Sequence, residues 1–440
     1  MHDDTIVAVA TPFGVGGIAV VRLSGSQALP IAEAHLSTKN LAPRHATHCR
    51  FDNLDDVVAT WFPQGYTGEP TVEISCHGSA YIQQTIVQAL CDDGARMAER
   101  GEFTMRAFLN GRMDLSQAEA VADLIEATTP AQHRLAVSQL RGGYADELKT
   151  LRQQLVDLTA LLELELDFSQ EDVEFADRTR LCSLVDDISF RVNTLRRSFR
   201  TGNALRRGIP VAIIGRPNAG KSSLLNALLH DDRAIVSDTP GTTRDTIEET
   251  FVIDGTPFRI IDTAGLRKSD DPLETMGVQR TINTAALADI IIYVHDATQS
   301  FAQAIDDLAG LQDVVPLKDK HLLVVHNKID LLEGPIPTNV TFPLSAKEGT
   351  GIDTLLSELS SCIPQRTASD ILLTNVRHLK ALEHTDNALM QVAKGLSDNL
   401  PADLLAVDLR DALYHLGTIT GEVVTDEVLS TIFSRFCVGK

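Results

Sequence analysis

A chain of 440 residues is longer than one hydrophobic core usually serves, so two or three domains are expected. Its formal net charge of −21 excludes a protein that holds nucleic acid by overall positive charge; any RNA must meet a local basic patch or a second protein. Six scattered cysteines without a CxxC pair argue against zinc and against a disulfide framework. No apolar run approaches the roughly 20 residues of a membrane span, and two acids stand where a signal peptide needs basic residues, so a cytoplasmic location without a membrane is predicted.

Four segments follow one another along the chain. Residues 1–115 alternate short β-like runs (TIVAVA, GIAVVRLSG, TVEISCHG) with turns and short helices, which predicts an α+β domain. Residues 116–206 are predicted to be helical, and residues 371–440 again. Residues 207–370 alternate strand-like runs (PVAIIG, FRIID, DIIIYVHD, HLLVVHNK, VTFPLS) with helix-length segments, which is typical of a parallel sheet with crossover helices.

One apolar stripe marks the first helical segment. Its leucines recur at spacings of three and four, the period of one helix face. They are Leu148, Leu151, Leu155, Leu158 and Leu162. The two helical segments could form one bundle into which the α/β domain is inserted.

A phosphate-binding loop lies between a predicted strand and a predicted helix. Residues 215–222, GRPNAGKS, match the pattern G-x-x-x-x-G-K-[ST]. Backbone N–H groups of such a loop cradle phosphates at a helix N-terminus. Lys221 is predicted to reach the β- and γ-phosphates and Ser222 to bind magnesium. The other nucleotide-binding positions of this loop and the helix start are Asn218, Ala219, Gly220 and Ser223.

Further nucleotide motifs follow in order at predicted strand ends. The DTAG motif would hold magnesium through water and sense the γ-phosphate, and Thr243 in GTTRD could complete the metal shell. In NKID, the carboxylate of Asp330 would pair with the N1–H and amine of guanine, and the SAK segment would pack against the base. These positions are Gly241, Thr242, Thr243, Asp262, Thr263, Ala264, Gly265, Asn327, Lys328, Asp330, Ser345, Ala346 and Lys347. Together they predict a GTPase.

The residue that orients the attacking water is not evident from the motifs. Leu266 follows DTAG, and a leucine cannot orient water. Asp270, Asp271 and Glu274 lie downstream as candidates, although a solvated acidic loop explains them equally well.

The chain resembles the MnmE (TrmE) family of bacterial tRNA-modification GTPases. The resemblance runs from DTIVAVATPFGVGGIAVVRLSG through GEFTMRAFLNGRMDLSQAEAVADLI to the closing SRFCVGK, and so covers essentially the whole chain. Small departures are Val438, where the family usually has isoleucine, Arg112, where many members have lysine, and Pro240, where many have alanine.

The resemblance implies a Ras-like P-loop GTPase domain inserted in a helical bundle and preceded by an α+β folate-binding and dimerisation domain. It also implies a homodimer, the flavoprotein partner MnmG (GidA) and a tRNA substrate. GTP hydrolysis to GDP and phosphate would gate installation of an aminomethyl or carboxymethylaminomethyl group at carbon 5 of the wobble uridine. The implied cofactors are magnesium, potassium and 5-formyl- or methylene-tetrahydrofolate.

Individual positions match the family's functional residues. Glu274 matches the glutamate that orients water indirectly, and it is the predicted catalytic residue beside Lys221. Thr243 matches the second magnesium ligand. The potassium ligands implied are Asn218, Ser237, Thr239 and Thr242, in a loop that adds Asp238 and Pro240 to the nucleotide contacts. The folate positions implied are Arg22, Glu73, Arg112 and Lys440.

Three alternatives stay open at the level of sequence. Cys437 is either a nucleophile or a small structural residue beside the folate pocket; without a His or acid partner, the structural role is favoured. A GTP-switched RNA-assembly protein of the Era or EngA kind would carry a basic RNA-binding module, which is not seen. A folate enzyme in its own right would rest on His77 alone, and a lone histidine is more often structural.

Overall fold

The computed structural model describes residues 4–12, 14–167, 178–230, 249–261, 282–313, 315, 317, 320–334, 341–363, 371–434 and 436–439. The chain divides into two compact units. The first contains Met1–Ile125, Ser138–Phe190 and Lys380–Lys440, and the second contains Glu126–Val137 and Arg191–Leu379.

The N-terminal part of the first unit is a six-stranded sheet with the order β3-β4-β5-β2-β1-β6. All neighbouring strands are antiparallel except β1 and β6, which are parallel. The elements in chain order are β1 (Ile6–Val9), β2 (Ile18–Ser24), α1 (Ala28–His35), β3 (Thr47–Phe51), β4 (Asp55–Phe62), β5 (Thr71–His77), α2 (Ala80–Asp92), β6 (Arg96–Met97) and α3 (Glu102–Leu109).

The two faces of this sheet differ because successive side chains of a strand point to opposite sides. Val21 and Leu23 of β2 and Ile74 of β5 are fully buried in one core together with apolar residues of α1 and α2. Both helices therefore cover the same face. Arg22 and Glu73, at the intervening positions of β2 and β5, belong to the other face.

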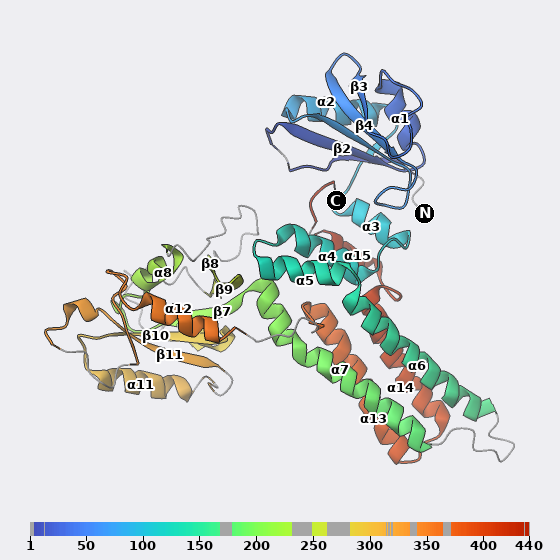
Figure 1. The fold of residues 1–440 in the computed structure, drawn as a ribbon. Helices are drawn as coiled ribbons and strands as arrows, with labels where there is room; N and C mark the ends of the chain where they lie inside the picture. The colour runs from blue at the N-terminus through green and yellow to red at the C-terminus, as the bar shows by residue number, and fades with distance from the viewer. Residues whose placement is uncertain are drawn as a thin grey trace. The chain divides into compact units, whose positions relative to one another are not determined.

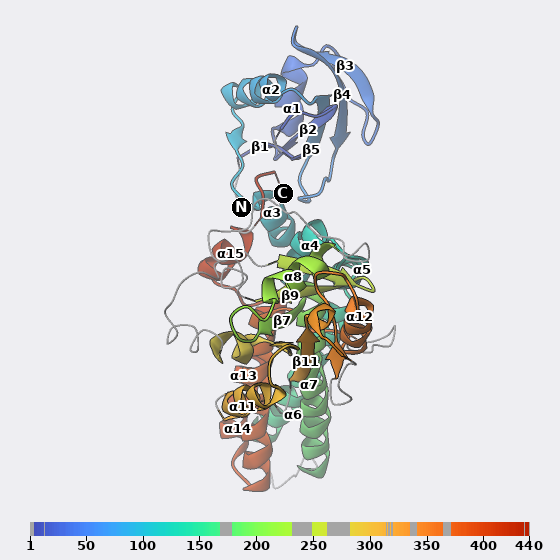
Figure 2. The same ribbon diagram turned by 90° about the vertical axis from the view of Figure 1, so that its left-hand side faces the viewer.

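Long helices complete the first unit. They are α4 (Leu115–Glu126), α6 (Gly143–Asp167), α14 (Ala402–Thr420), α15 (Asp426–Phe433) and parts of α7 (Arg178–Arg207) and α13 (Val376–Ser397). The predicted leucine stripe of α6 is confirmed, since all five leucines are at most 1% exposed. Helices α6 and α14 lie side by side (Figures 1 and 2). Helices before and after the α/β segment thus pack together, which confirms the predicted insertion.

The second unit holds the other six-stranded sheet, with the order β12-β11-β10-β7-β9-β8. Its strands are parallel as predicted, except that β8 at the edge is antiparallel to β9, a strand that the sequence analysis did not predict. The elements are α5 (Pro130–Leu140), whose end extends into the first unit, β7 (Ile209–Ile214), α8 (Lys221–His230), β8 (Glu249–Ile253), β9 (Thr256–Ile260), β10 (Ile290–Asp296), α11 (Phe301–Gln312), β11 (His321–Asn327), the 3-10 helix η1 (Ile329–Leu331), β12 (Phe342–Pro343) and α12 (Ile352–Ser361).

Helices cover both faces of the second sheet. Leucines of α8 and α12 share a core with Val211 and Ile213 of β7, whereas α11 packs on the opposite face against Ala212 and Ile214. A doubly covered parallel sheet of this kind brings the carboxyl ends of its strands to one edge, where ligands of such sheets usually bind. Among the described helices, none is both long and apolar enough to cross a bilayer.

Candidate functional site

The loop between β7 and α8 has a backbone that only glycine fits at two positions. Gly215 has φ 146° and Gly220 has φ 92°. A Cβ atom on Gly215 would lie 2.2 Å from the carbonyl oxygen of Val294, and one on Gly220 would lie 2.1 Å from Nδ2 of Asn327. The loop therefore lies directly against β10 and the end of β11, and a side chain at either glycine would push it away from these strands.

Lys221 opens helix α8, and its side chain folds over the loop. Its Nζ donates to the carbonyl oxygens of Gly215 at 2.9 Å and Arg216 at 2.8 Å. Burial lowers the pKa of the Lys221 ammonium. Ser222 and Ser223 follow in the first helical turn and are exposed. A lysine ammonium and the N-terminus of a helix at one point favour anionic oxygen atoms.

The loop is anchored to the sheet from outside by Arg216. Its guanidinium forms two hydrogen bonds with the carboxylate of Asp307 on α11, at 2.7 and 2.8 Å. Tyr293 of β10 donates to the same carboxylate at 2.6 Å. The sequence analysis did not assign these residues a role, because Asp307 lies 91 positions after Arg216.

Asn327 connects this loop with the segment that follows β12. Its Nδ2 donates to the carbonyl oxygen of Ala219 at 2.9 Å, and its Oδ1 accepts from the N–H of Ala346 at 3.0 Å. The side chain is buried, with 2% of the residue exposed. An amide that offers both a donor and an acceptor is needed for this double contact.

The neighbouring residues present charged groups at the same sheet edge. Ser345 donates from Oγ to Oδ1 of Asp330 at 2.6 Å. Lys328, whose φ is 67°, places Nζ 2.7 Å from Oδ2 of Asp296, at the end of β10. Lys347 next to Ala346 is exposed. The structure thus brings the NKID and SAK segments together, and it adds Asp296, which could have been noticed as an acid at a strand end.

A buried histidine pair lies under these residues. His295 of β10 and His326 of β11 are opposite each other in the parallel register, and their Nδ1 atoms are 3.2 Å apart. The Nε2 atom of each has no hydrogen-bond partner among the described residues. Burial, and secondarily His295, lowers the pKa of His326 to about 4. His326 is therefore uncharged near neutral pH, a feature that alternation in the strands did not reveal.

Several predicted site residues lie outside the described residues. They are Ser237, Asp238, Thr239, Pro240, Gly241, Thr242, Thr243, Asp262, Thr263, Ala264, Gly265, Glu274 and Lys440.

On the N-terminal sheet, Arg22 and Glu73 form an ion pair. They are register partners on β2 and β5, and Oε1 of Glu73 accepts from Nε of Arg22 at 2.9 Å and lies 2.8 Å from its Nη2. The guanidinium also lies over the rings of Tyr66 and Phe103, at 5.5 and 5.7 Å from their centroids. The two residues are 20% and 30% exposed, so they line a partly open polar face.

The C-terminal segment lies against this domain. Gly101 donates its N–H to the carbonyl oxygen of Cys437 at 3.4 Å, and Arg100 forms a β-bridge with Val438. Gly439, with φ 98°, leaves no room for a Cβ, which would lie 2.2 Å from the carbonyl oxygen of Val9. The exposed thiol of Cys437 therefore lies at the β1 end of the sheet.

Arg112 is exposed beside the loop that precedes β5. A Cβ atom built on Gly68 of that loop would lie 3.1 Å from Cγ of Arg112. Tyr66 of the same loop has its ring under the guanidinium of Arg22. The described members of the predicted folate set thus lie around this one loop. Nδ1 of His77 forms a hydrogen bond with Oδ1 of Asp55 at 2.7 Å, and the histidine side chain is 68% exposed, which fits a structural role at the surface.

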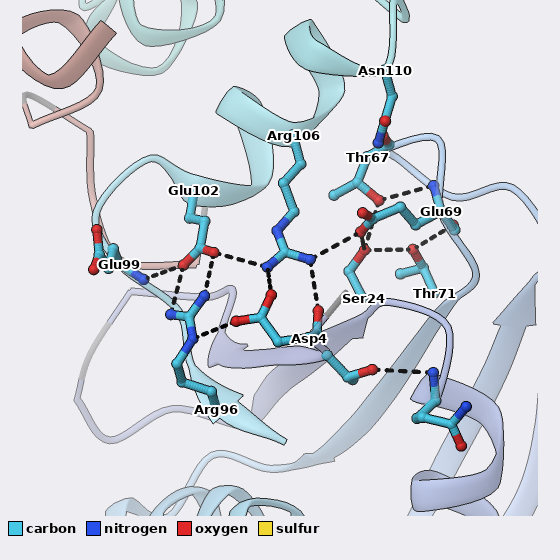
Figure 3. A network of polar contacts seen from close by, with 12 residues as sticks. Asp4, Ser24, Thr67, Glu69, Thr71, Arg96, Glu99, Glu102, Arg106 and Asn110 are labelled. Atoms are coloured by element: carbon cyan, nitrogen blue, oxygen red, sulfur yellow. Dashed lines mark hydrogen bonds and ion pairs between the residues drawn. The ribbon is translucent and has the colours of Figure 1, made fainter. Parts of the chain in front are cut away.

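An ionic network around the buried Arg106 was not predicted (Figure 3). Arg106 of α3, 2% exposed, donates to Oδ1 of Asp4 at 2.7 Å and to Oε1 of Glu102 at 2.9 Å, and it contacts Glu69 at 3.4 Å. Arg96 bridges Asp4 and Glu102 from the other side. Hydrogen bonds from Arg96, supported by those from Arg106, lower the pKa of Asp4 to about 2. The network fixes the chain start, α3 and the loop before β5 to one another.

Comparison with known proteins accounts for both parts of the chain. Residues 115–437 match the family described as MnmE helical domain, and residues 5–112 match the family described as GTP-binding protein TrmE N-terminus. The whole chain is 47% identical to the tRNA modification GTPase MnmE of Cytophaga hutchinsonii and covers 98% of it. The chain belongs to the MnmE family. It is a tRNA modification GTPase.

Other relatives agree. The MnmE proteins of Flavobacterium johnsoniae and Parabacteroides distasonis are 45% and 47% identical over 100% and 99% of this chain, and each is covered completely. The solved structure of Era with MgGDPNP and a segment of 16S ribosomal RNA is 26% identical over 41% of this chain and 66% of its own, with a TM-score of 0.27. That overlap adds no argument to the MnmE assignment.

Proposed function

We propose that the chain is a potassium-activated GTPase that, together with the flavoprotein MnmG, installs an aminomethyl or carboxymethylaminomethyl group at carbon 5 of the wobble uridine of certain tRNAs. The observation that carries the GTPase part is the double contact of Asn327. It ties the phosphate loop at Ala219 to the base-binding segment at Ala346, so both ends of a nucleotide meet one connected frame. MnmG and the modification chemistry rest on the family resemblance.

In this proposal the phosphates lie on residues 218–223, with Lys221 on the β- and γ-phosphates. Asp330 reads guanine, while Lys328 and residues 345–347 surround the base. The ion pair with Asp296 fixes Nζ of Lys328 at the sheet edge. Magnesium binds oxygen ligands. The hydroxyl of the exposed Ser222 at the helix start fits as one of them, with Thr243 as the second. Asp262 would act on the metal through water, and Glu274 would orient the attacking water.

Potassium binding would involve Asn218, Ser237, Thr239 and Thr242. Asn218 fits this role because it is exposed and its φ of 61° turns the tip of the loop outward. An asparagine side-chain oxygen is a suitable ligand for a hard cation. The ion would supply positive charge beside the phosphates when bound.

GTP turnover in matched potassium chloride and sodium chloride tests this proposal. At equal ionic strength and without an added activator, turnover is expected to be at least tenfold faster in potassium, because the ion replaces a missing cationic side chain. Asn218→Ala should bring the potassium rate down to the sodium rate, with Asn203→Ala on helix α7 as control. Equal rates of the wild type in both salts would refute the potassium site and leave the GTPase assignment standing.

The folate site of the proposal comprises Arg22, Glu73, Arg112 and Lys440. These residues fit a folate only in part, because Arg22 and Glu73 form an ion pair with each other. In the proposal the pterin ring donates its adjacent N–H groups to the carboxylate of Glu73, whereas the arginines and Lys440 suit the glutamate tail. The bound folate would supply the one-carbon unit.

Calorimetry with 5-formyltetrahydrofolate tests the folate site. Glu73→Gln is expected to weaken binding at least tenfold, since a carboxylate acceptor for two pterin donors is lost. Asp56→Asn, an exposed acid on the neighbouring β4, should bind as the wild type does. Unchanged affinity of Glu73→Gln would remove this residue from the site.

The domain division proposed with this function is residues 1–115 for folate binding and dimerisation, 116–206 and 371–440 for the helical domain, and 207–370 for the GTPase domain. A homodimer and a larger complex with MnmG belong to the same proposal.

A further inference from the structure

Helix α7 concentrates positive charge in an acidic protein. Its 30 residues contain eight arginines and two aspartates, whereas the whole chain has a net charge of −21. Membership in a tRNA modification family requires contact with RNA, and an acidic chain can make that contact only through a local patch or a partner. The location of these arginines therefore bears on how the substrate is held.

Four of the five arginines of the last three turns gather on one side of the helix. At 3.6 residues per turn, Arg196, Arg200 and Arg207 fall within a sector of about 40°, and Arg197 lies about 60° to one side. Arg197, Arg200 and Arg207 are exposed. Their span along the axis is about 16 Å, which at about 3.4 Å per nucleotide equals about four or five nucleotides of one strand.

The surroundings of this cluster add a cation and one acid. Arg200 pairs with Asp289 at 3.5 Å. Lys320 lies beside this ion pair, because its Nζ donates to the carbonyl oxygen of Ala288, the residue that precedes Asp289. Its Nζ is held by the carbonyl oxygens of Ala286 and Ala288 at 2.7 and 2.5 Å. Lys320 thus joins the four arginines in one basic patch.

The patch is separate from the nucleotide site. Arg207 lies two positions before β7, and the phosphate loop begins only after that strand ends. The six residues of β7 span about 20 Å. The arginines therefore lie near the opposite edge of the sheet from Lys221 and cannot serve the phosphates of GTP.

The chemistry of the patch favours an RNA backbone. Guanidinium groups bind phosphates through paired N–H donors, whereas a binding surface for small anions needs an enclosed cradle. An exposed aromatic ring, Phe190 at 74%, lies seven residues before Arg197 on the same helix, two turns along. Aromatic rings next to arginines suit unpaired bases.

We propose that Arg196, Arg197, Arg200 and Arg207 of helix α7, with Lys320, form a binding surface for the sugar-phosphate backbone of the tRNA substrate. This surface deepens the proposed function, because it assumes that the chain itself touches the tRNA. It is independent of the folate and potassium sites.

Binding of an unmodified tRNA transcript, measured by fluorescence anisotropy from 50 to 300 mM potassium chloride, tests the surface. The triple variant R197Q/R200Q/R207Q is expected to bind at least about tenfold more weakly at 100 mM salt, and its log–log salt slope should be shallower by about 2 to 3. The control R44Q/R50Q/R180Q removes three exposed arginines elsewhere and should behave as the wild type.

Folding is monitored independently by GTP turnover, which the triple variant should retain. If it does not, the single variant R197Q decides, with an expected loss of about 1 in salt slope. Equal effects of patch and control variants, or tRNA binding unchanged in both, would overturn the proposal and would point to an acidic protein as the occupant. A wild type that binds no tRNA at any salt would overturn it too, while potassium-dependent GTP turnover would still be observed if the proposed GTPase mechanism is right.

Discussion

An Asp330→Asn variant is expected to lose GTP and to gain xanthosine triphosphate as a substrate. Guanine presents an N1–H and an amine as donors, which a carboxylate accepts. Xanthine keeps the N1–H but has a carbonyl in place of the amine, and an asparagine amide offers the matching acceptor and donor. Ser345 Oγ, 2.6 Å from Oδ1 of Asp330, keeps the side chain oriented in both proteins.

The effect should be large because both hydrogen bonds are made to a charged group. Two such bonds are worth about 3–6 kcal/mol, so kcat/KM for GTP should fall about 10²- to 10⁴-fold. Steady-state turnover with both nucleotides measures it, and Asp353→Asn, an exposed acid of α12, is the control. Retention of GTP preference by Asp330→Asn would mean that another residue reads the base.

Arg106→Met should destabilise the N-terminal domain by about 3–5 kcal/mol. The substitution keeps an unbranched apolar side chain at the buried position 106. It removes one cationic partner from each of Asp4, Glu69 and Glu102 (Figure 3). The cost is expected mainly at Glu102, whose side chain is 3% exposed and stays away from water when Arg106 is removed.

Trp61 makes this measurement specific, since it is the single tryptophan of the chain and lies in β4 of the same sheet. Its fluorescence in a urea titration reports unfolding of that domain. Arg100→Met, at an exposed position of the segment that pairs with Val438, should change stability by less than about 0.5 kcal/mol. Equal midpoints for the two variants would show that the network contributes little.

Sequence was sufficient where the chemistry is local. The phosphate loop needs its glycines, Lys221 and Ser222 next to one another between a strand and a helix, so eight consecutive residues predict both the fold and the ligand. The leucine stripe of α6 and the parallel strands also follow from spacing along the chain. The edge strand β8 was not predicted because apolar and polar residues alternate only weakly in ETFVI.

The base site combines residues that a motif predicts with contacts that only the fold creates. The NKID motif predicted that Asn327 belongs to the site, yet its partner Ala219 is 108 positions away, and the hydrogen bond exists only because β7, β10 and β11 lie side by side. The same register brought His295 to His326 and Asp296 to Lys328. Spacing along one strand carries no information about its neighbour.

The sequence by itself determined that this protein binds a guanine nucleotide and belongs with the MnmE proteins, because those signals are contiguous motifs. The tertiary structure decided what pairs with what: Arg22 with Glu73, Arg106 with three acids, the C-terminal glycine with β1, and four arginines with one side of α7. These contacts depend on strand register, helix phase and chain closure, which are set by the burial of the cores as a whole.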